Sequence, residues 1–377
     1  MKDIKFILLK GISNFKAIHS SLVEKGATVV VVKPDMPAII NATRGGGCVI
    51  ISLSFDNFVL EMARNVDCLV VSWLSDKITV ANADFTGIDK SRYYVFSLDP
   101  KDVKDFINRG VKAWLLPSSS GLDGDAPLKL QGDDAEKYSS DISFVGQSIT
   151  VKHNPHLQFL LNFSNLSRHL NGVIEKQVDD FSSNTLKEAY DSGELNSFSL
   201  QYMLDYIHML DIRDLDFALG CEASSRLRKR LVSKLDGFDV RVYGDSHWES
   251  VRNGTIKVHK EISYRKETPK VYSRSKINLN ITKTFFEGTI QRVYDIIYCG
   301  GFCLTDYRED IENRFEPGKE IETYRNENEL VDKARYYLEH DNEREDIREG
   351  GYRRLQKEHR VGHRVDQVMQ IIGSALT

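Results

Sequence analysis

Short apolar runs alternate with stretches of helical spacing over the first third of the chain. The runs are rich in β-branched and aromatic residues, which favours strands, and they lie at residues 4–9, 28–32, 49–53, 68–73, 93–96 and 113–116. Between them, apolar residues at helical spacing predict helices at residues 17–24, 58–63 and 102–107. This alternation predicts a doubly wound α/β domain built on a parallel sheet.

A second series of the same kind begins at residue 142. Strands are predicted at residues 142–146, 240–245, 256–259, 277–281 and 302–304, and helices at residues 269–275, 290–298, 330–338 and 362–372. The stretch at residues 156–219 instead carries apolar side chains at helical spacing, among them Leu200, Met203, Leu204, Ile207 and Leu210. It predicts a helical insertion in the second domain, and an acceptor-binding surface is the alternative interpretation.

A polar stretch separates the two series. Residues 117–134 are rich in Ser, Gly, Asp and Pro, and with residues 135–140 they are interpreted as a linker region. The chain has 377 residues, which suits two domains of roughly 150 to 200 residues. We therefore predict an N-terminal Rossmann-like domain at residues 1–138. A second Rossmann-like domain is predicted at residues 139–377, with closing helices at its C-terminal end.

Composition narrows the class of protein. The net charge of −4 gives no general reason to expect nucleic acid or an acidic membrane surface as a partner. The five cysteines are scattered without zinc spacing, which indicates reduced thiols. The apolar start of the chain is interrupted by lysines and is interpreted as a first strand, and no apolar run approaches the roughly 20 residues that span a bilayer. A cytoplasmic enzyme is the resulting expectation.

One segment of the second domain combines the residue types of a sugar-nucleotide site. Glu287 and Asp295 stand on either side of Arg292, between the strand at residues 277–281 and the helix-ending pair Gly300-Gly301. A strand–loop–helix unit places the helix N-terminus at the carboxyl edge of a parallel sheet, where its amides and dipole favour phosphate. Glu287 is expected to bind hydroxyls of the donor sugar, and Arg292 is expected to bind the diphosphate. Ribose is assigned to Asp295, and Gly288 and Thr289 are expected to let the loop approach the donor closely.

Several stretches of this region resemble the CgeB-like glycosyltransferases, a group within the group-1-type glycosyltransferases. They cover residues 271–281, 292–296, 299–307 and 315–321, and residues 336–338, Glu343, Arg344 and His359 extend the resemblance. Its strong part spans about residues 239–365. The resemblance implies the GT-B fold, in which two Rossmann-like domains face a cleft. The N-terminal domain is then on the acceptor side, and the C-terminal domain holds the donor. Glu287 and Asp295 fall where many retaining GT-B transferases carry an E-x7-E pair, with Asp295 replacing the usual glutamate.

Further donor contacts follow from glycines at strand ends and from the resemblance. Gly146 and Gly244 end two predicted strands, where a glycine lets backbone approach a ligand. GT-B enzymes commonly carry an Arg and a Lys after the first of these glycines. Here Gln147 occupies the Arg position, while Lys152 is available as a phosphate ligand. The loop at residues 259–262 is expected beside the nucleotide base.

Other motifs have simpler interpretations. Asp123-Gly124-Asp125 spells a DxD metal motif, but it lies in the linker, so no metal site is expected. Residues 44–47 are interpreted as a flexible glycine loop, with phosphate or acceptor binding as the alternative. Residues 226–230 are interpreted as a solvated basic helix face, with contact to an anionic membrane or a polyanionic acceptor as the alternative. His19, within a predicted helix, is interpreted as structural rather than as a catalytic base.

The function predicted from these features is transfer of a sugar from a nucleotide-diphosphate donor to a hydroxyl acceptor, with a glycan as the expected acceptor. No cofactor or metal is expected, and paired acids of this kind are typical of retention of the anomeric configuration. Two alternatives remain open: a sugar-nucleotide epimerase of the same fold, and a non-catalytic protein that binds sugar nucleotides.

Overall fold

The computed structural model describes residues 4–11, 15–76, 83–122, 126, 128, 132–149, 161–162, 164–181, 183, 185–194 and 212–376. Its contacts divide the chain into two compact units. Unit 1 comprises Met1–Asp125, Gly288–Tyr298 and Arg353–Thr377, and unit 2 comprises Ala126–Glu287 and Cys299–Tyr352. The sequence pattern predicts that all residues after 138 belong to the second domain. The contacts instead group Gly288–Tyr298 and Arg353–Thr377 with unit 1.

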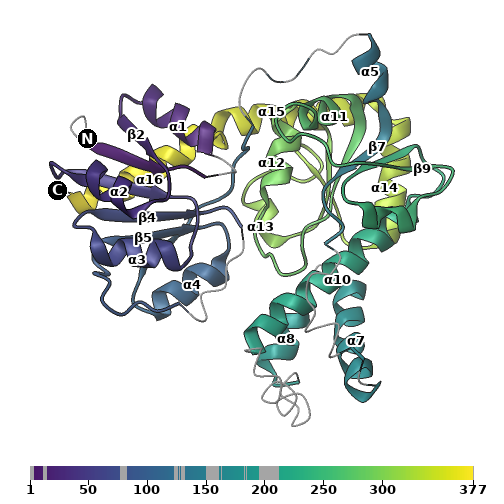
Figure 1. The fold of residues 1–377 in the computed structure, drawn as a ribbon. Helices are drawn as coiled ribbons and strands as arrows, with labels where there is room; N and C mark the ends of the chain where they lie inside the picture. The colour runs from purple at the N-terminus through teal and green to yellow at the C-terminus, as the bar shows by residue number, and fades with distance from the viewer. Residues whose placement is uncertain are drawn as a thin grey trace. The chain divides into compact units, whose positions relative to one another are not determined.

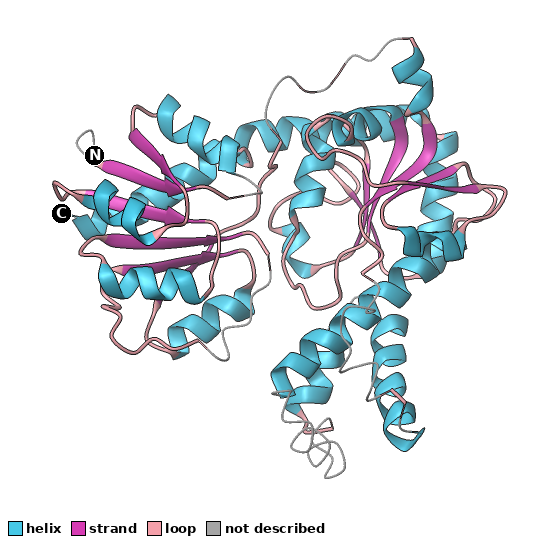
Figure 2. Ribbon diagram, viewed as in Figure 1, coloured by secondary structure: helices cyan, strands magenta, loops and turns pink. Residues whose placement is uncertain are grey.

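Unit 1 is built on a six-stranded parallel sheet in the order β2-β1-β3-β4-β5-β6 (Figures 1 and 2). Its strands are β1 (Lys5–Leu9), β2 (Thr28–Val32), β3 (Cys48–Ser52), β4 (Leu69–Leu74), β5 (Tyr93–Ser97) and β6 (Lys112–Leu115). Each predicted strand is confirmed to within about one residue at either end. The chain adds β2 on one side of β1 and all later strands on the other side. The loops after β1 and β3 therefore diverge at the carboxyl edge of the sheet.

Helices cover both faces of this sheet. They are α1 (Phe15–Glu24), α2 (Met36–Thr43), α3 (Asn57–Asn65), α4 (Pro100–Asn108) and α16 (Val361–Leu376). Helix α12 (Gln291–Tyr298) is grouped with the same unit. Successive side chains of a strand point to opposite faces. Accordingly, Phe6 and Leu8 of β1 pack with Ile18 of α1 and Val368 of α16, whereas Ile7 packs with side chains of α2, α3 and α4.

Unit 2 is built on a second six-stranded parallel sheet in the order β12-β11-β10-β7-β8-β9. Its strands are β7 (Ser140–Val145), β8 (Val240–Tyr243), β9 (Ile256–His259), β10 (Ser275–Asn280), β11 (Cys303–Asp306) and β12 (Glu322–Tyr324). This is the order of a dinucleotide-binding Rossmann sheet, with its switch point between β7 and β10. The prediction of two Rossmann-like α/β domains is confirmed.

The helices of unit 2 include a group inserted between β7 and β8. That group consists of α7 (Ser164–Asp179), α8 (Thr185–Asp191) and α10 (Ile212–Lys234). In Figure 1, α7 and α10 lie side by side and extend beyond the sheet. The helical insertion is therefore confirmed within the described residues, while Leu200, Met203, Leu204, Ile207 and Leu210 lie outside them. The other helices are α5 (Asp133–Lys137), η2 (Ser246–Val251), α11 (Thr268–Arg274), α13 (Glu309–Glu312), α14 (Glu327–Glu339) and α15 (Asp341–Glu358).

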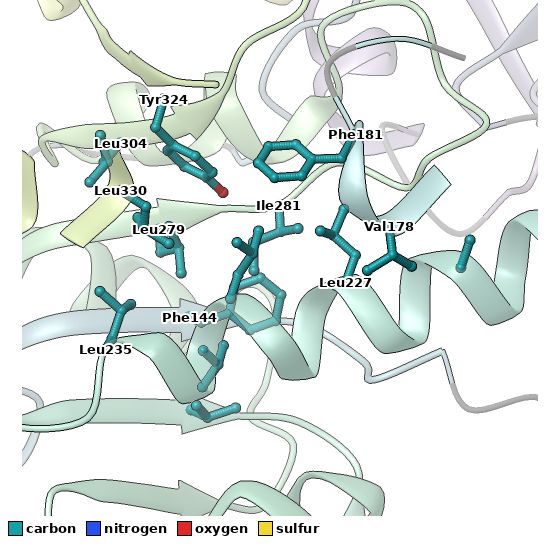
Figure 3. Close-up of a cluster of buried hydrophobic side chains, with 14 of the residues drawn as sticks. Phe144, Val178, Phe181, Leu227, Leu235, Leu279, Ile281, Leu304, Tyr324 and Leu330 are labelled. Atoms are coloured by element: carbon teal, nitrogen blue, oxygen red, sulfur yellow. The ribbon is translucent and has the colours of Figure 1, made fainter. Parts of the chain in front are cut away.

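One large apolar core joins the inserted helices to the sheet of unit 2. Phe144 of β7 and Leu279 of β10 share this core with Leu227 of α10 and with Leu235, which follows the helix (Figure 3). The buried hydroxyl of Tyr324 donates to the carbonyl of Asn280 at 2.9 Å, so it is satisfied inside this core. None of the described helices is long and apolar enough to cross a membrane.

Candidate functional site

The loops after β7 and β8 meet at the carboxyl edge of the unit 2 sheet. A Cβ atom on Gly244 would lie 2.3 Å from the carbonyl oxygen of Gly146 and 2.7 Å from Nε1 of Trp248. That indole nitrogen donates to the same carbonyl at 2.9 Å. Gly244 is therefore required by the close approach of the protein's own backbone. Donor binding by Gly146 and Gly244 stays a prediction.

Asp245 ties these two loops together. Its carboxylate accepts bonds from the Ser148 amide at 2.6 Å and the Ser148 hydroxyl at 2.8 Å, and from the His247 amide at 2.9 Å. Burial raises the pKa of Asp245, but these bonds outweigh it and lower the pKa below its usual value. The carboxylate is thus ionised at neutral pH and holds the segment after Gly146 in place.

The ring of His259 stacks on Tyr243 at the ends of β8 and β9. The ring centroids are 4.9 Å apart and the planes differ by 18°. Burial, and then the nearby Arg241 guanidinium, lower the pKa of His259, so the ring is neutral at pH 7. A neutral stacked pair of this kind is compatible with the expected nucleotide base beside residues 259–262, which stays a prediction.

Arg228 lies in the protein interior, and the interpretation of residues 226–230 as a solvated helix face is wrong for it. Its side chain is 2% exposed and donates to the carbonyls of Gln147 at 2.7 Å and Ile281 at 3.0 Å. Those carbonyls follow β7 and β10, the two strands of the switch point. Arg226 and Arg230 form ion pairs with acidic side chains instead.

The segment after β10 carries Glu287 and alternates buried with half-buried side chains. Thr282, Thr284 and Phe286 are buried, whereas Lys283, Phe285 and Glu287 are half-buried. Thr282 is fixed by bonds from its amide and its hydroxyl to Asp306, at 2.8 and 2.9 Å. Glu287 itself is half-buried, so part of its side chain is accessible to solvent.

Gly288, Thr289 and helix α12 belong to unit 1. A Cβ atom on Gly288 would lie 2.6 Å from the carbonyl oxygen of Leu98, so a close backbone contact requires this glycine. Thr289 is buried, and Arg292 is half-buried in the first turn of α12. The roles of these three residues toward a donor stay predictions.

Asp295 is held by protein groups. Asp295 is 3% exposed. One oxygen of its carboxylate accepts hydrogen bonds from the Ser120 hydroxyl at 2.7 Å and from the Gly121 amide at 3.0 Å. Its second oxygen lies 3.3 Å from the Gln291 amide nitrogen. In this structure the carboxylate anchors the segment after β6 to α12, and the ribose contact stays a prediction that would require these partners to be displaced.

Asp295→Ala is expected to lower the free energy of unfolding of unit 1 by about 2 kcal/mol, because the Ser120 hydroxyl and the Gly121 amide would be buried without an acceptor. Asp295→Asn keeps one acceptor oxygen and should lose less. Chemical unfolding of both variants, with the exposed-site control Glu61→Ala, measures the effect. Equal stability of Asp295→Ala and the control would contradict this structural role.

A pocket of about 700 Å³ opens in unit 1 where β1, β3 and β4 end. The charged side chains that line it are Lys10, Asp56 and Asp76, and Gln291 from the first turn of α12 also contributes. Asp56 caps α3 through a 2.9 Å bond from the Val59 amide. The pocket thus combines both signs of charge at the edge of the sheet where α/β folds bind ligands.

The remaining candidates do not add to these sites. Lys152 and Asp123-Gly124-Asp125 lie outside the described residues. Gly45, Gly46 and Gly47 all have positive φ, in the turn that precedes β3 at the amino edge of its sheet. His19 stacks on Phe15 within α1. Within the described ranges, no group of three or more His, Cys, Asp or Glu residues is arranged to hold a metal ion.

Comparison with protein families and curated sequences identifies a related segment. Residues 225–370 match a family model described as glycosyl transferase-like. The chain is also 33% identical over 122 residues to an uncharacterized protein of Aquifex aeolicus (strain VF5). That alignment covers 31% of this chain and 29% of the relative, so the chain matches less than a third of the relative's length. The narrower CgeB-like assignment stays a prediction.

Comparison with solved structures covers nearly the whole chain. T4 phage BGT in complex with UDP and Mn²⁺ has a TM-score of 0.53 at 11% identity, over 99% of both chains. Anabaena Alr3699/HepE in complex with UDP-glucose has a TM-score of 0.56 at 8% identity, over 98% of this chain and 99% of that one. Sucrose-phosphate synthase from Thermosynechococcus elongatus has a TM-score of 0.56 at 8% identity, over 98% of both. These likenesses show that the fold of the chain is GT-B.

Proposed function

We propose that this protein transfers a sugar from a nucleoside-diphosphate donor to a hydroxyl group of a glycan acceptor. The observation that carries the proposal is the family match at residues 225–370, which contains the segment from Glu287 to Asp295. The GT-B neighbours that were solved with UDP or UDP-glucose make UDP-sugars the first donors to test.

In the proposed reaction, Glu287 orients the donor sugar through its hydroxyls and stabilises the positive charge that develops at the anomeric carbon in the transition state. Its half-buried position in the segment after β10 supports this role. The bond between the anomeric carbon and the diphosphate oxygen breaks, and a bond to the acceptor oxygen forms. The acceptor proton leaves with the diphosphate, and the anomeric configuration is retained.

The diphosphate leaves with negative charge, which fixed donors stabilise. Arg292 and the amides at the N-terminus of α12 supply such donors, since a helix N-terminus and a guanidinium both favour phosphate. Preorganised groups of this kind can perform electrostatically what a metal ion performs elsewhere. We therefore propose a metal-independent reaction.

The pocket of about 700 Å³ in unit 1 is the proposed acceptor site. Lys10, Asp56 and Asp76 offer hydrogen-bond donors and acceptors to a molecule rich in hydroxyl groups. This assignment agrees with the acceptor role that the resemblance implies for the N-terminal domain.

The proposal is tested by incubating the protein with UDP-, GDP- and dTDP-sugars, with and without EDTA, and measuring release of the nucleoside diphosphate. One donor is expected to be turned over, at a rate that EDTA changes less than about twofold, since fixed protein donors replace the metal. A CMP-sugar, which lacks a diphosphate, is the matched control. A new sugar isomer would instead identify an epimerase, and binding without turnover a non-catalytic protein. Loss of turnover in EDTA would contradict metal independence.

A further inference from the structure

Helix α10 carries a buried stripe of three residues, Gly220, Ser224 and Arg228. They are four residues apart, so they lie on one face of the helix. All three are buried, with Ser224 at 0% and Arg228 at 2% exposure. A small residue, a hydroxyl and a guanidinium form an unusual line for a helix that otherwise buries leucines in the core of unit 2.

The central member of this stripe bonds to the segment that carries Glu287. The Thr284 amide donates to the Ser224 hydroxyl oxygen at 2.9 Å, and the two hydroxyl oxygens are 3.2 Å apart. Both hydroxyls also reach the carbonyl of Gly220, at 2.6 Å from Ser224 and 3.1 Å from Thr284. These bonds close a small buried network between the helix and the segment.

The two outer members hold the segment on either side of that network. A Cβ atom on Gly220 would lie 2.7 Å from Cδ1 of Phe285, so the aromatic ring rests directly on the helix backbone. At the other end, Arg228 donates to the carbonyl of Ile281 at 3.0 Å. Residues 281–285 therefore run along α10 from Arg228 to Gly220, and Glu287 follows two residues later.

We propose that Gly220, Ser224 and Arg228 are positioning residues that fix the Glu287 carboxylate for the sugar-transfer step. The proposal rests on the proposed function, because it gives the stripe a role through Glu287. The segment has no regular secondary structure between β10 and α12, so its shape depends on such contacts. A displacement of about 1 Å at a reacting group can cost on the order of 100-fold in rate. Through the stripe, the inserted helix α10 supports the segment that carries Glu287.

The test uses two pairs of variants in the full chain. Ser224→Ala removes the acceptor of the Thr284 amide, and Thr284→Val removes the second hydroxyl at constant shape. Thr284→Ser keeps that hydroxyl and is expected to retain activity. Ser225→Ala is the matched control, since Ser225 is also buried on α10 but lies outside the stripe. Hydrogen exchange of residues 281–287 and the kinetics of donor turnover are measured for each.

Ser224→Ala and Thr284→Val are expected to speed amide exchange at residues 281–287 and to lower kcat about tenfold. The KM for the donor should change less than about threefold, because Glu287 acts in the transition state. Unchanged exchange in both variants would overturn the proposed contact, and faster exchange with wild-type kcat would overturn the positioning role. The exchange measurement needs no turnover, so failure of the proposed function would show separately as an inactive wild type.

Discussion

Glu287→Ala is expected to lower turnover of the nucleotide-sugar donor by about 100-fold or more, with the fold intact. In the proposed reaction the carboxylate stabilises charge on the donor sugar as it leaves the diphosphate, and removal of one such group typically costs this much. Because Glu287 is half-buried at the end of an irregular segment, its loss should shift Tm by less than about 2 °C. Single-turnover kinetics and thermal unfolding together measure the two effects.

Two further variants make this result specific. Glu287→Gln keeps the shape of the side chain, so its loss of rate reports on the charge. Glu339→Ala removes an exposed carboxylate at the end of α14 and should keep wild-type turnover. Wild-type turnover in Glu287→Ala would remove the residue from the proposed site, whereas equal losses in Glu287→Ala and Glu339→Ala would point to a general effect of charge.

Gly244→Ala is expected to lower the free energy of unfolding of unit 2 by about 3 kcal/mol. The added methyl group would lie 2.3 Å from the Gly146 carbonyl oxygen, and it would press on the indole that donates to this oxygen. Overpacking of this kind is costly when the atom in the way is backbone. Urea unfolding followed by tryptophan fluorescence measures the effect, with Trp248 reporting from unit 2 and Trp73 and Trp114 from unit 1.

Gly254→Ala is the matched control for this prediction. No heavy atom lies within 4 Å of its added Cβ atom, and the residue belongs to the same unit. The comparison also separates two roles of Gly244. Wild-type stability with weakened nucleotide binding would favour close approach to a ligand, as the sequence pattern predicts, over the packing role that the structure shows.

The strands were predictable because parallel strands are buried on both faces. All five residues of β5 are buried, and the first four, Tyr93–Phe96, form a continuous apolar and aromatic run. β12 was missed because it is short and begins with a buried carboxylate, Glu322, which is satisfied by Lys333 and by the hydroxyl of Tyr337. Helix α15 was missed because charged side chains cover most of its surface, so no apolar stripe marks it.

The secondary structure around the candidate site was predictable, but the contacts of its residues with distant parts of the chain were not. The sequence pattern predicted a strand before Glu287 and a helix after it, because a strand–loop–helix unit is visible in local patterns. The partner of Asp295 is Ser120, 175 residues away, and no local pattern identifies a contact of that range. Arg228 was misinterpreted because three other basic residues surround it in the sequence, although its spacing from Ser224 and Gly220 was available as a clue.

The assignment of Arg353–Thr377 to unit 1 has a consequence for synthesis of the chain. Val365, Val368 and Ile372 of α16 cover the face of the sheet that α1 also covers. The ribosome makes these residues after all of unit 2, so a nascent unit 1 keeps part of this apolar face open until then. Removal of residues from the carboxyl end would therefore expose the apolar core of unit 1, which is synthesised first, before it affects unit 2.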